Sequence, residues 1–256
     1  MTTNRNDLRR LKLAGFHLLA SVGVAAIVAV AVLRIWYPYP FSAVAGGLSL
    51  FTLLVSVDVI LGPALTAVAA SPTKPVPELR RDLAVIVAVQ LAAFAYGMHT
   101  IAVARPVHLA FEVDRMRVVT AADIEPGSLR DSVPEFRSLP WFGPTLLAAI
   151  KPVNPEEQLR SIDLGLAGVD LSMVPANWRD YSSLSATVWA KARPVQVLVD
   201  KYPESEAALI AIARTEHQSV ADLRFLPLQS RQASWATIVA APGARVVGHL
   251  PFDSFF

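Results

Sequence analysis

The stretch LAGFHLLASVGVAAIVAVAVL, from Leu13 to Leu33, contains no charged side chain. Phe41–Ser71 contains one charged residue, Asp58, and Leu83–Ala104 contains none. A helix needs about 20 predominantly apolar residues to cross the hydrocarbon core of a bilayer. Each stretch is long enough, so the sequence predicts a bundle of three transmembrane helices at about residues 13–34, 43–70 and 83–104. Residues 105–256 are left to form a domain outside the membrane.

The composition of the 256 residues limits the kinds of site that the chain can carry. Hydrophobic residues make up 54% of the chain, and the formal net charge is only +2. A strongly basic face is therefore not expected, and we predict no nucleic-acid partner. The sequence has no cysteine, which excludes disulfides, cysteine-ligated zinc or iron–sulfur clusters, and thiol catalysis.

Positively charged residues flank the apolar stretches unevenly. The flanks of the first stretch and of the third carry Arg5, Arg9, Arg10, Lys12, Lys74, Arg80 and Arg81. The segment between the first and second stretches has only Arg34. Since Lys and Arg mark the cytoplasmic side, we predict a multi-pass membrane protein with a cytoplasmic amino terminus and a carboxy-terminal domain outside, which in a Gram-negative cell is the periplasm. The first stretch is longer than a signal-peptide core and lacks a small-residue cleavage motif after it, which favours an uncleaved anchor.

Residues 105–256 have the pattern of a small α+β domain. Alternating apolar residues predict strands at Val107–Val113 and Met116–Val119, joined as a hairpin. Further elements are expected as a short helical stretch ending at Ile150, helices at Pro155–Leu164 and Glu204–Arg214, and strands at Leu223–Gln229, Ser234–Ala240 and Arg245–Leu250. We expect the helices to pack on an antiparallel sheet. The pattern is weakest over residues 154–200.

Asp58 lies near the middle of the second predicted helix. A charged side chain at that depth costs at least roughly 2.5–3.5 kcal/mol, so such residues usually face a helix interior or an aqueous path. With the second and third helices antiparallel, Gln90 falls at about the same depth as Asp58. Asp58 therefore has three candidate roles: it fastens the bundle, recognises another transmembrane segment, or takes part in ion translocation. Gly62 and Pro63 follow on the same helix, and the proline predicts a kink.

No combination of residues in the sequence indicates catalysis. The five histidines lack the spacing of a metal site, and the chain has no G-x-S-x-G element, Walker A loop or dinucleotide-binding glycine motif. We therefore expect no catalytic residue, no metal and no cofactor, and we predict that the protein is not an enzyme.

Trp141 and Phe142 stand out among the aromatic residues because Pro140 and Pro144 flank them and hold them in a loop. Most tryptophans of a domain of this size belong to its core. Aromatic residues are also enriched at protein interfaces. We therefore take Trp141 and Phe142 as the candidate contact surface of the periplasmic domain.

Several segments of the chain resemble one protein family. They are VDVILGPALT at Val57–Thr66, DLAVI at Asp82–Ile86, FEVDR at Phe111–Arg115, LPW at Leu139–Trp141 and VVGHLP at Val246–Pro251. In these segments the chain resembles the type IV pilin accessory proteins, which are encoded beside pilin genes in Gram-negative bacteria. The likeness runs from the first apolar helix to the carboxyl terminus.

The resemblance implies an accessory protein of type IV pilus biogenesis in the bacterial inner membrane, a pilin-specific chaperone without enzymatic activity. The implied partner is the major pilin, through both its membrane helix and its periplasmic head. The inner-membrane pilus assembly platform is a further implied partner, and the lipid bilayer surrounds the helices. We expect the bundle, with Asp58, Gly62 and Pro63, to pack against the pilin helix while the periplasmic domain contacts the pilin head.

Two alternatives come from other functional classes. A membrane-anchored sensor would bind a small ligand in its periplasmic domain, but it would need a cytoplasmic output module, and the predicted cytoplasmic segments are short. A membrane enzyme would use clustered carboxylates at the outer face, such as Glu112 and Asp114. A solvated hairpin is the simpler explanation of these two residues.

Overall fold

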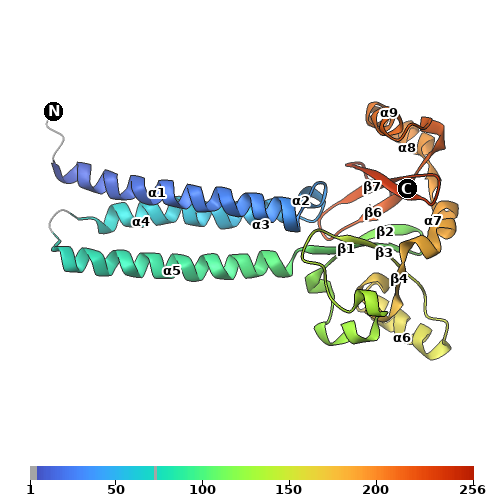
Figure 1. The fold of residues 1–256 in the computed structure, drawn as a ribbon, viewed down its shortest axis with the longest axis horizontal. Coiled ribbons are helices and arrows are strands. Elements are labelled where there is room, and N and C mark those ends of the chain that lie inside the picture. The colour runs from blue at the N-terminus through green and yellow to red at the C-terminus, as the bar shows by residue number, and fades with distance from the viewer. Residues whose placement is uncertain (1–4, 72–73) are drawn as a thin grey trace. The chain divides into compact units, whose positions relative to one another are not determined.

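The computed structural model of the chain describes residues 5–71 and 74–256 (Figure 1). Contacts divide this described chain into two compact units, which we call the helical unit and the sheet unit. The helical unit consists of the chain up to Ile35 together with Gly46–Ala104, and the sheet unit consists of Trp36–Ala45 and Arg105–Phe256. The chain therefore passes from one unit to the other after Ile35, after Ala45 and after Ala104.

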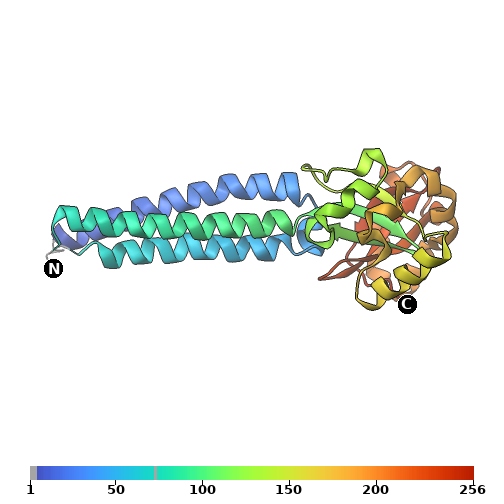
Figure 2. The same cartoon turned by 90° about the horizontal axis from the view of Figure 1, so that it is seen from below.

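Long apolar helices run side by side in the helical unit (Figures 1 and 2). Their segments are α1 (Arg5–Ala31) with the π-helical turn η1 (Val32–Trp36), then α3 (Gly47–Ser56), the π-helical turn η2 (Val57–Leu61) and α4 (Gly62–Ala69), and finally α5 (Val76–Val103). In the described residues three helices are long and apolar enough to cross a membrane, over Leu11–Trp36, Gly47–Ala69 and Val76–Val103. The three long apolar helices that the sequence predicts are thus present.

One mixed β-sheet, eight-stranded within the described part of the chain, forms the centre of the sheet unit. The strand order is β4-β3-β1-β2-β6-β7-β8, and the short β5 pairs with β6. The strands are β1 (Pro106–Glu112), β2 (Arg115–Thr120), β3 (Thr145–Ala149), β4 (Trp178–Asp180), β5 (Arg193–Pro194), β6 (Leu223–Gln229), β7 (Ser234–Ala240) and β8 (Arg245–Leu250). The helices of this unit are α2 (Phe41–Val44), α6 (Pro155–Leu166), α7 (Ser185–Lys191), α8 (Val195–Lys201) and α9 (Glu206–Thr215).

The hairpins of the sheet follow the predicted pattern. β1 and β2 form the expected antiparallel hairpin around a tight turn at Val113 and Asp114. β6, β7 and β8 coincide with the three predicted strands and pair antiparallel in chain order. Their connections are short turns, and a short turn permits only antiparallel pairing. The predicted helices that begin near Pro155 and Glu204 are present as α6 and α9.

The prediction of an antiparallel sheet is wrong, because β1 pairs with β3, and β2 with β6, in parallel. The predicted helical stretch before Ile150 is also wrong, since Thr145–Ala149 is strand β3. Leu and Ala favour a helix locally, but Leu147, Ala148 and Ala149 are buried in a strand between β1 and β4. Burial in the sheet outweighs that local preference. Strand β2 returns the chain to the start of β1, and the long connection Ala121–Pro144 then carries it to the other side of β1, so β3 runs parallel to β1.

Helices and strands of the sheet unit share apolar clusters. Leu198 of α8 and Leu209 of α9 are fully buried in one cluster with Phe225 of β6. Trp178 is fully buried in another cluster with Leu147. Trp178 therefore belongs to the core, as expected for most tryptophans of the domain.

The connection between the first two long helices, Trp36–Ala45, is built into the core of the sheet unit. Val44 is fully buried and Phe41 is 8% exposed, and both belong to one cluster with Phe111 of β1. The Phe41 ring meets the His249 imidazole at 5.9 Å between ring centroids. The apolar stretch that begins at Phe41 thus starts in a protein core and not in a membrane helix.

Two local features fix this connection in place. The Ser230 hydroxyl donates a hydrogen bond to the carbonyl oxygen of Val44. Gly46 has φ +75°, a left-handed conformation that costs glycine little. The chain therefore turns sharply at Gly46, and α3 begins at Gly47.

We expect Phe41→Ala to lower the free energy of unfolding of the sheet unit by about 3 kcal/mol, because it leaves a cavity in the core. The control is Tyr39→Ala, which removes a 76% exposed ring from the same segment and should cost less than about 0.5 kcal/mol. Thermal unfolding of the full-length chain in detergent, followed by tryptophan fluorescence, measures both. Equal losses would show that Trp36–Ala45 does not belong to the core.

We also expect the stability of the chain to depend on pH through two buried histidines. Burial lowers the pKa of His108 and of His249 from 6.5 to about 4. Between these values the unfolded chain binds protons that the folded chain excludes, so stability should fall as the pH decreases from about 6.5 to about 4. A shift of this size corresponds to about 3 kcal/mol for each histidine.

Unfolding temperatures measured across this pH range check the effect. A chain with His108→Gln and His249→Gln should show a shallower loss of stability on acidification. His217→Gln, which changes an exposed imidazole, is the control. An unchanged slope in the double variant would contradict the prediction.

Candidate functional site

Four residues singled out in the sequence lie together in the helical unit, and we call Asp58, Gly62, Pro63 and Gln90 the polar centre. η2 carries Asp58, α4 begins with Gly62 and Pro63, and α5 carries Gln90. Gln90 Nε2 donates a hydrogen bond to the backbone carbonyl oxygen of Asp58 at 3.4 Å. This bond joins the second long helix to the third.

Pro63 explains why the carbonyl of Asp58 needs this donor. In a π-helical turn each N–H donates to the carbonyl five residues earlier, and proline has no N–H. The helix therefore has no donor for Asp58, five residues before Pro63, and Gln90 supplies one. In hydrocarbon an unsatisfied carbonyl costs several kcal/mol. The helix continues through Pro63 as α4, with the π-helical turn η2 directly before it.

Gly62 leaves the space that the Gln90 amide occupies. A Cβ atom at this position would lie 2.1 Å from Gln90 Nε2. Gly97 on α5 similarly leaves space for Leu54, whose Cδ1 would lie 2.5 Å from an added Cβ. Small residues at close helix contacts are common in membranes, and both glycines serve the contact between the second and third helices.

Asp58 itself is half-buried, midway along the candidate span Gly47–Ala69. Within residues 5–71 and 74–256 its carboxylate accepts no hydrogen bond, and it interacts electrostatically with His17. His17 Nδ1 lies 2.6 Å from Thr66 Oγ1, a contact that ties α1 to α4. Gln90 Oε1 is also buried and has no donor in the described chain. The polar centre therefore has more hydrogen-bond acceptors than hydrogen-bond donors.

Trp141 and Phe142 belong to the sheet unit and are 61% and 80% exposed. The Arg105 guanidinium lies 4.7 Å from the centroid of the Trp141 ring. The Trp36 and Trp141 rings are tilted against each other with 6.5 Å between centroids. Contacts of this kind hold the Trp141 ring in one place while leaving much of it open to a partner.

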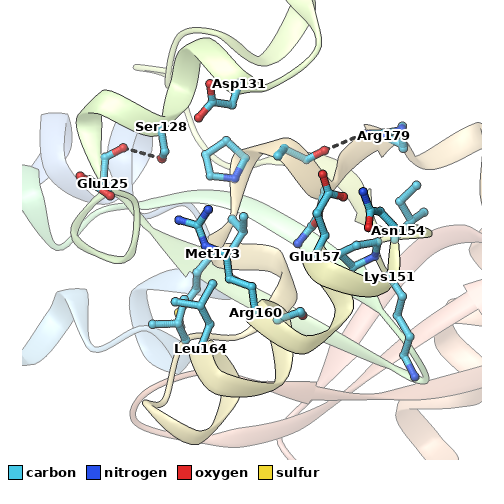
Figure 3. A pocket seen from close by; sticks show the side chains of 18 of the residues that line it. Glu125, Ser128, Asp131, Lys151, Asn154, Glu157, Arg160, Leu164, Met173 and Arg179 are labelled. Carbon is cyan, nitrogen blue, oxygen red and sulfur yellow. Dashed lines mark hydrogen bonds between the residues drawn. The ribbon is translucent and has the colours of Figure 1, made fainter.

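A cavity of about 650 Å³ is the feature that the sequence did not indicate (Figure 3). It is lined by α6, the 3-10 turns η4 (Pro126–Asp131) and η7 (Pro175–Asn177), and the strand ends near them. Its charged lining residues include Glu125, Asp131, Glu157, Lys151, Arg160 and Arg179. These residues come from distant parts of the chain without a common motif, so no local pattern could have found them.

The charged side chains do not suggest a metal centre. In the part of the chain that the structure describes, no three His, Asp or Glu side chains are grouped so that they could hold a metal ion.

Comparison with known proteins gives the family. The family described as "Fimbrial assembly protein FimB" matches residues 6–46. A protein of Dichelobacter nodosus called fimbrial assembly protein, serogroup I, is 35% identical over 245 residues, which cover 95% of each chain. The chain belongs to the fimbrial assembly protein family. This membership confirms the family resemblance found in the sequence.

Further relatives agree with this fimbrial assembly protein assignment. The serogroup E1 protein of Dichelobacter nodosus is 34% identical over 245 residues, again 95% of each chain. The protein of serogroups C1 and C2 is 40% identical over 124 residues, which cover 48% of this chain and 92% of its own. No solved structure matches the chain. The matched residues 6–46 cover α1 from its second residue, η1 and the connection Trp36–Ala45.

We expect Gly62→Ala in this fimbrial assembly protein to displace the Gln90 amide and lower the stability of the helical unit by about 1 kcal/mol. Gly23→Ala is the matched control, because an added Cβ at Gly23 meets no atom within 4 Å. Unfolding of the full-length protein by SDS titration in mixed micelles measures both. If the two variants unfold at the same SDS fraction, the contact between Gly62 and Gln90 does not stabilise the bundle.

Proposed function

We propose that this fimbrial assembly protein is an inner-membrane accessory protein of type IV pilus biogenesis. It acts as a pilin-specific chaperone that stabilises the major pilin or presents it for assembly. The observation that carries the proposal is the 35% identity to a fimbrial assembly protein over 95% of both chains. The charge asymmetry of the sequence supports a cytoplasmic amino terminus and a periplasmic sheet unit.

The polar centre supports contact with a membrane helix of the client. A carboxylate midway along a membrane span is costly unless it meets a donor or a cation. Asp58 interacts electrostatically with His17, but in the described residues its carboxylate accepts no hydrogen bond, and Gln90 Oε1 is a second acceptor without a donor. A client helix that carries a hydroxyl, amide or ammonium group would supply the missing donor. Such polar contacts are one of the forces that join helices in lipid.

The exposed aromatic pair supports a second contact, with the periplasmic head of the client. Trp141 and Phe142 offer an exposed apolar surface, and the contact with Arg105 holds the Trp141 ring. Tryptophan and tyrosine are frequent anchors of protein interfaces. A client with a membrane helix and a soluble head would therefore meet this chain at two separate surfaces.

We expect a photoreactive residue at Val59, beside Asp58, and one at Trp141 to crosslink the major pilin in native inner membranes. Mass spectrometry identifies the adducts. Val85 in α5 and Ile210 in α9 are exposed apolar control positions in the two units. Asp58→Leu should reduce the adduct at Val59 about threefold, the effect of losing about 0.6 kcal/mol of polar helix contact. The adduct at Trp141 should change less.

The chaperone proposal fails if pilin is absent from both test positions while other proteins are labelled efficiently. Pilin adducts of equal yield at the test and control positions would also contradict a specific client contact.

A further inference from the structure

Helix α6 turns three large apolar side chains away from the protein. Leu159, Ile162 and Leu166 share one helix face by their spacing and are 65%, 60% and 85% exposed. We call these three residues the α6 stripe. An amphipathic helix of a soluble domain normally packs such a face against the core. In α6, by contrast, no residue of the helix is buried.

The opposite face of α6 points toward the body of the sheet unit, where the cavity lies. Glu157, Arg160, Ser161 and Leu164 line this cavity of about 650 Å³ (Figure 3). The helix thus has a largely polar inner face over a hollow and an apolar outer face. The apolar face of α6 thus points away from the sheet unit, and packing among the residues that the structure describes does not account for it.

Hydrogen bonds at both ends stabilise helix α6, although none of its residues is buried. Asn154 accepts a hydrogen bond from the Glu156 N–H at 3.0 Å, which caps the first turn. At the other end Gly168 has φ +84°, and the Val169 N–H donates to the Leu164 carbonyl oxygen at 2.9 Å. This is the Schellman arrangement of a helix end. α6 therefore presents the stripe on a preformed helix, which lowers the entropy cost of binding.

The charge of α6 argues against two possible occupants of the stripe. Glu156, Glu157 and Asp163 against Arg160 give the helix a net charge of −2 (one positive and three negative). Helices that lie on membranes carry Lys and Arg toward the anionic lipid surface. A second α6 would bring the like net charges of the two helices together, which is unfavourable.

We propose that the α6 stripe docks into an apolar groove of a partner protein whose rim carries lysine or arginine. Helix-in-groove recognition uses apolar anchors at i, i+3 and i+7, which is the spacing of Leu159, Ile162 and Leu166. By helix geometry Glu156 and Asp163 border the stripe, and both are exposed. They pair with the basic rim and orient the helix. This surface is distinct from the polar centre and from Trp141, and the proposal does not depend on the chaperone function.

Photocrosslinking of the full-length protein in native membranes tests the proposal. Photoreactive residues are placed at Ile162 on the stripe and at the neighbouring Ser161 on the inner face. We expect one protein adduct at Ile162 and at least about fivefold less at Ser161, because adjacent helix residues point in different directions. Mapping of the crosslinked peptide should locate it at an apolar surface flanked by lysine or arginine.

Variants separate docking from a general loss of structure. Leu159→Ser should abolish the adduct at Ile162, and Asp163→Lys should reduce it about fivefold through repulsion from the basic rim. Ile210→Ser, at an exposed position of α9, should leave the adduct unchanged, and all three variants should keep the parent unfolding temperature.

Four results would overturn the proposal. They are a lipid adduct at Ile162, an adduct with a second copy of this chain, equal labelling at Ile162 and Ser161, and a protein adduct that is insensitive to Asp163→Lys. Pilin capture at Val59 and Trp141 is a separate measurement, so failure here leaves the chaperone function untouched.

Discussion

The burial of Phe41 and Val44 in the sheet core is the contact on which the rest of the structure depends. These residues lie between the first two long helices, while the strands β1 to β8 of the sheet all follow the third. The core therefore joins a segment made before the second span to strands made after the last. The sheet unit cannot complete its core until all three helices have been synthesised. The packing of the connection between the first two helices is therefore part of the folding of the sheet unit.

The helical unit depends on a second constraint, which a single proline imposes. Pro63 removes the donor that would continue the π-helical turn, and the carbonyl of Asp58 must then be satisfied from another helix. Gln90 supplies the donor, and Gly62 leaves room for it. Each of the three residues needs the other two, because a side chain at Gly62 blocks the amide and an apolar residue at position 90 leaves the carbonyl unpaired in a medium without water.

The sequence predicts an element of this structure well when the residues that determine the element lie close together in the chain. β6, β7 and β8 could be predicted to the residue, because alternation and short turns lie next to each other in the chain. β3 could not, since its partners are distant and its Leu and Ala residues favour a helix when considered alone. The composition of Phe41–Val44 suits a membrane helix and a protein core equally well, so apolarity alone could not separate the two. The meeting of Asp58 and Gln90 was predictable from depth along antiparallel helices, whereas the cavity under α6 required the fold.

Asp58 and the α6 stripe each differ in polarity from their surroundings. Asp58 is an ionisable group where the surroundings are apolar, and the stripe is an apolar surface where the surroundings are polar. Neither results from poor local structure: a π-helical turn holds Asp58, and capping at both ends holds α6. Sequences tend to depart from local consistency at functional sites, because a misplaced group is costly until a partner supplies its missing environment. A donor for Asp58 and a groove for α6 are different environments, so the two features are suited to different partner surfaces.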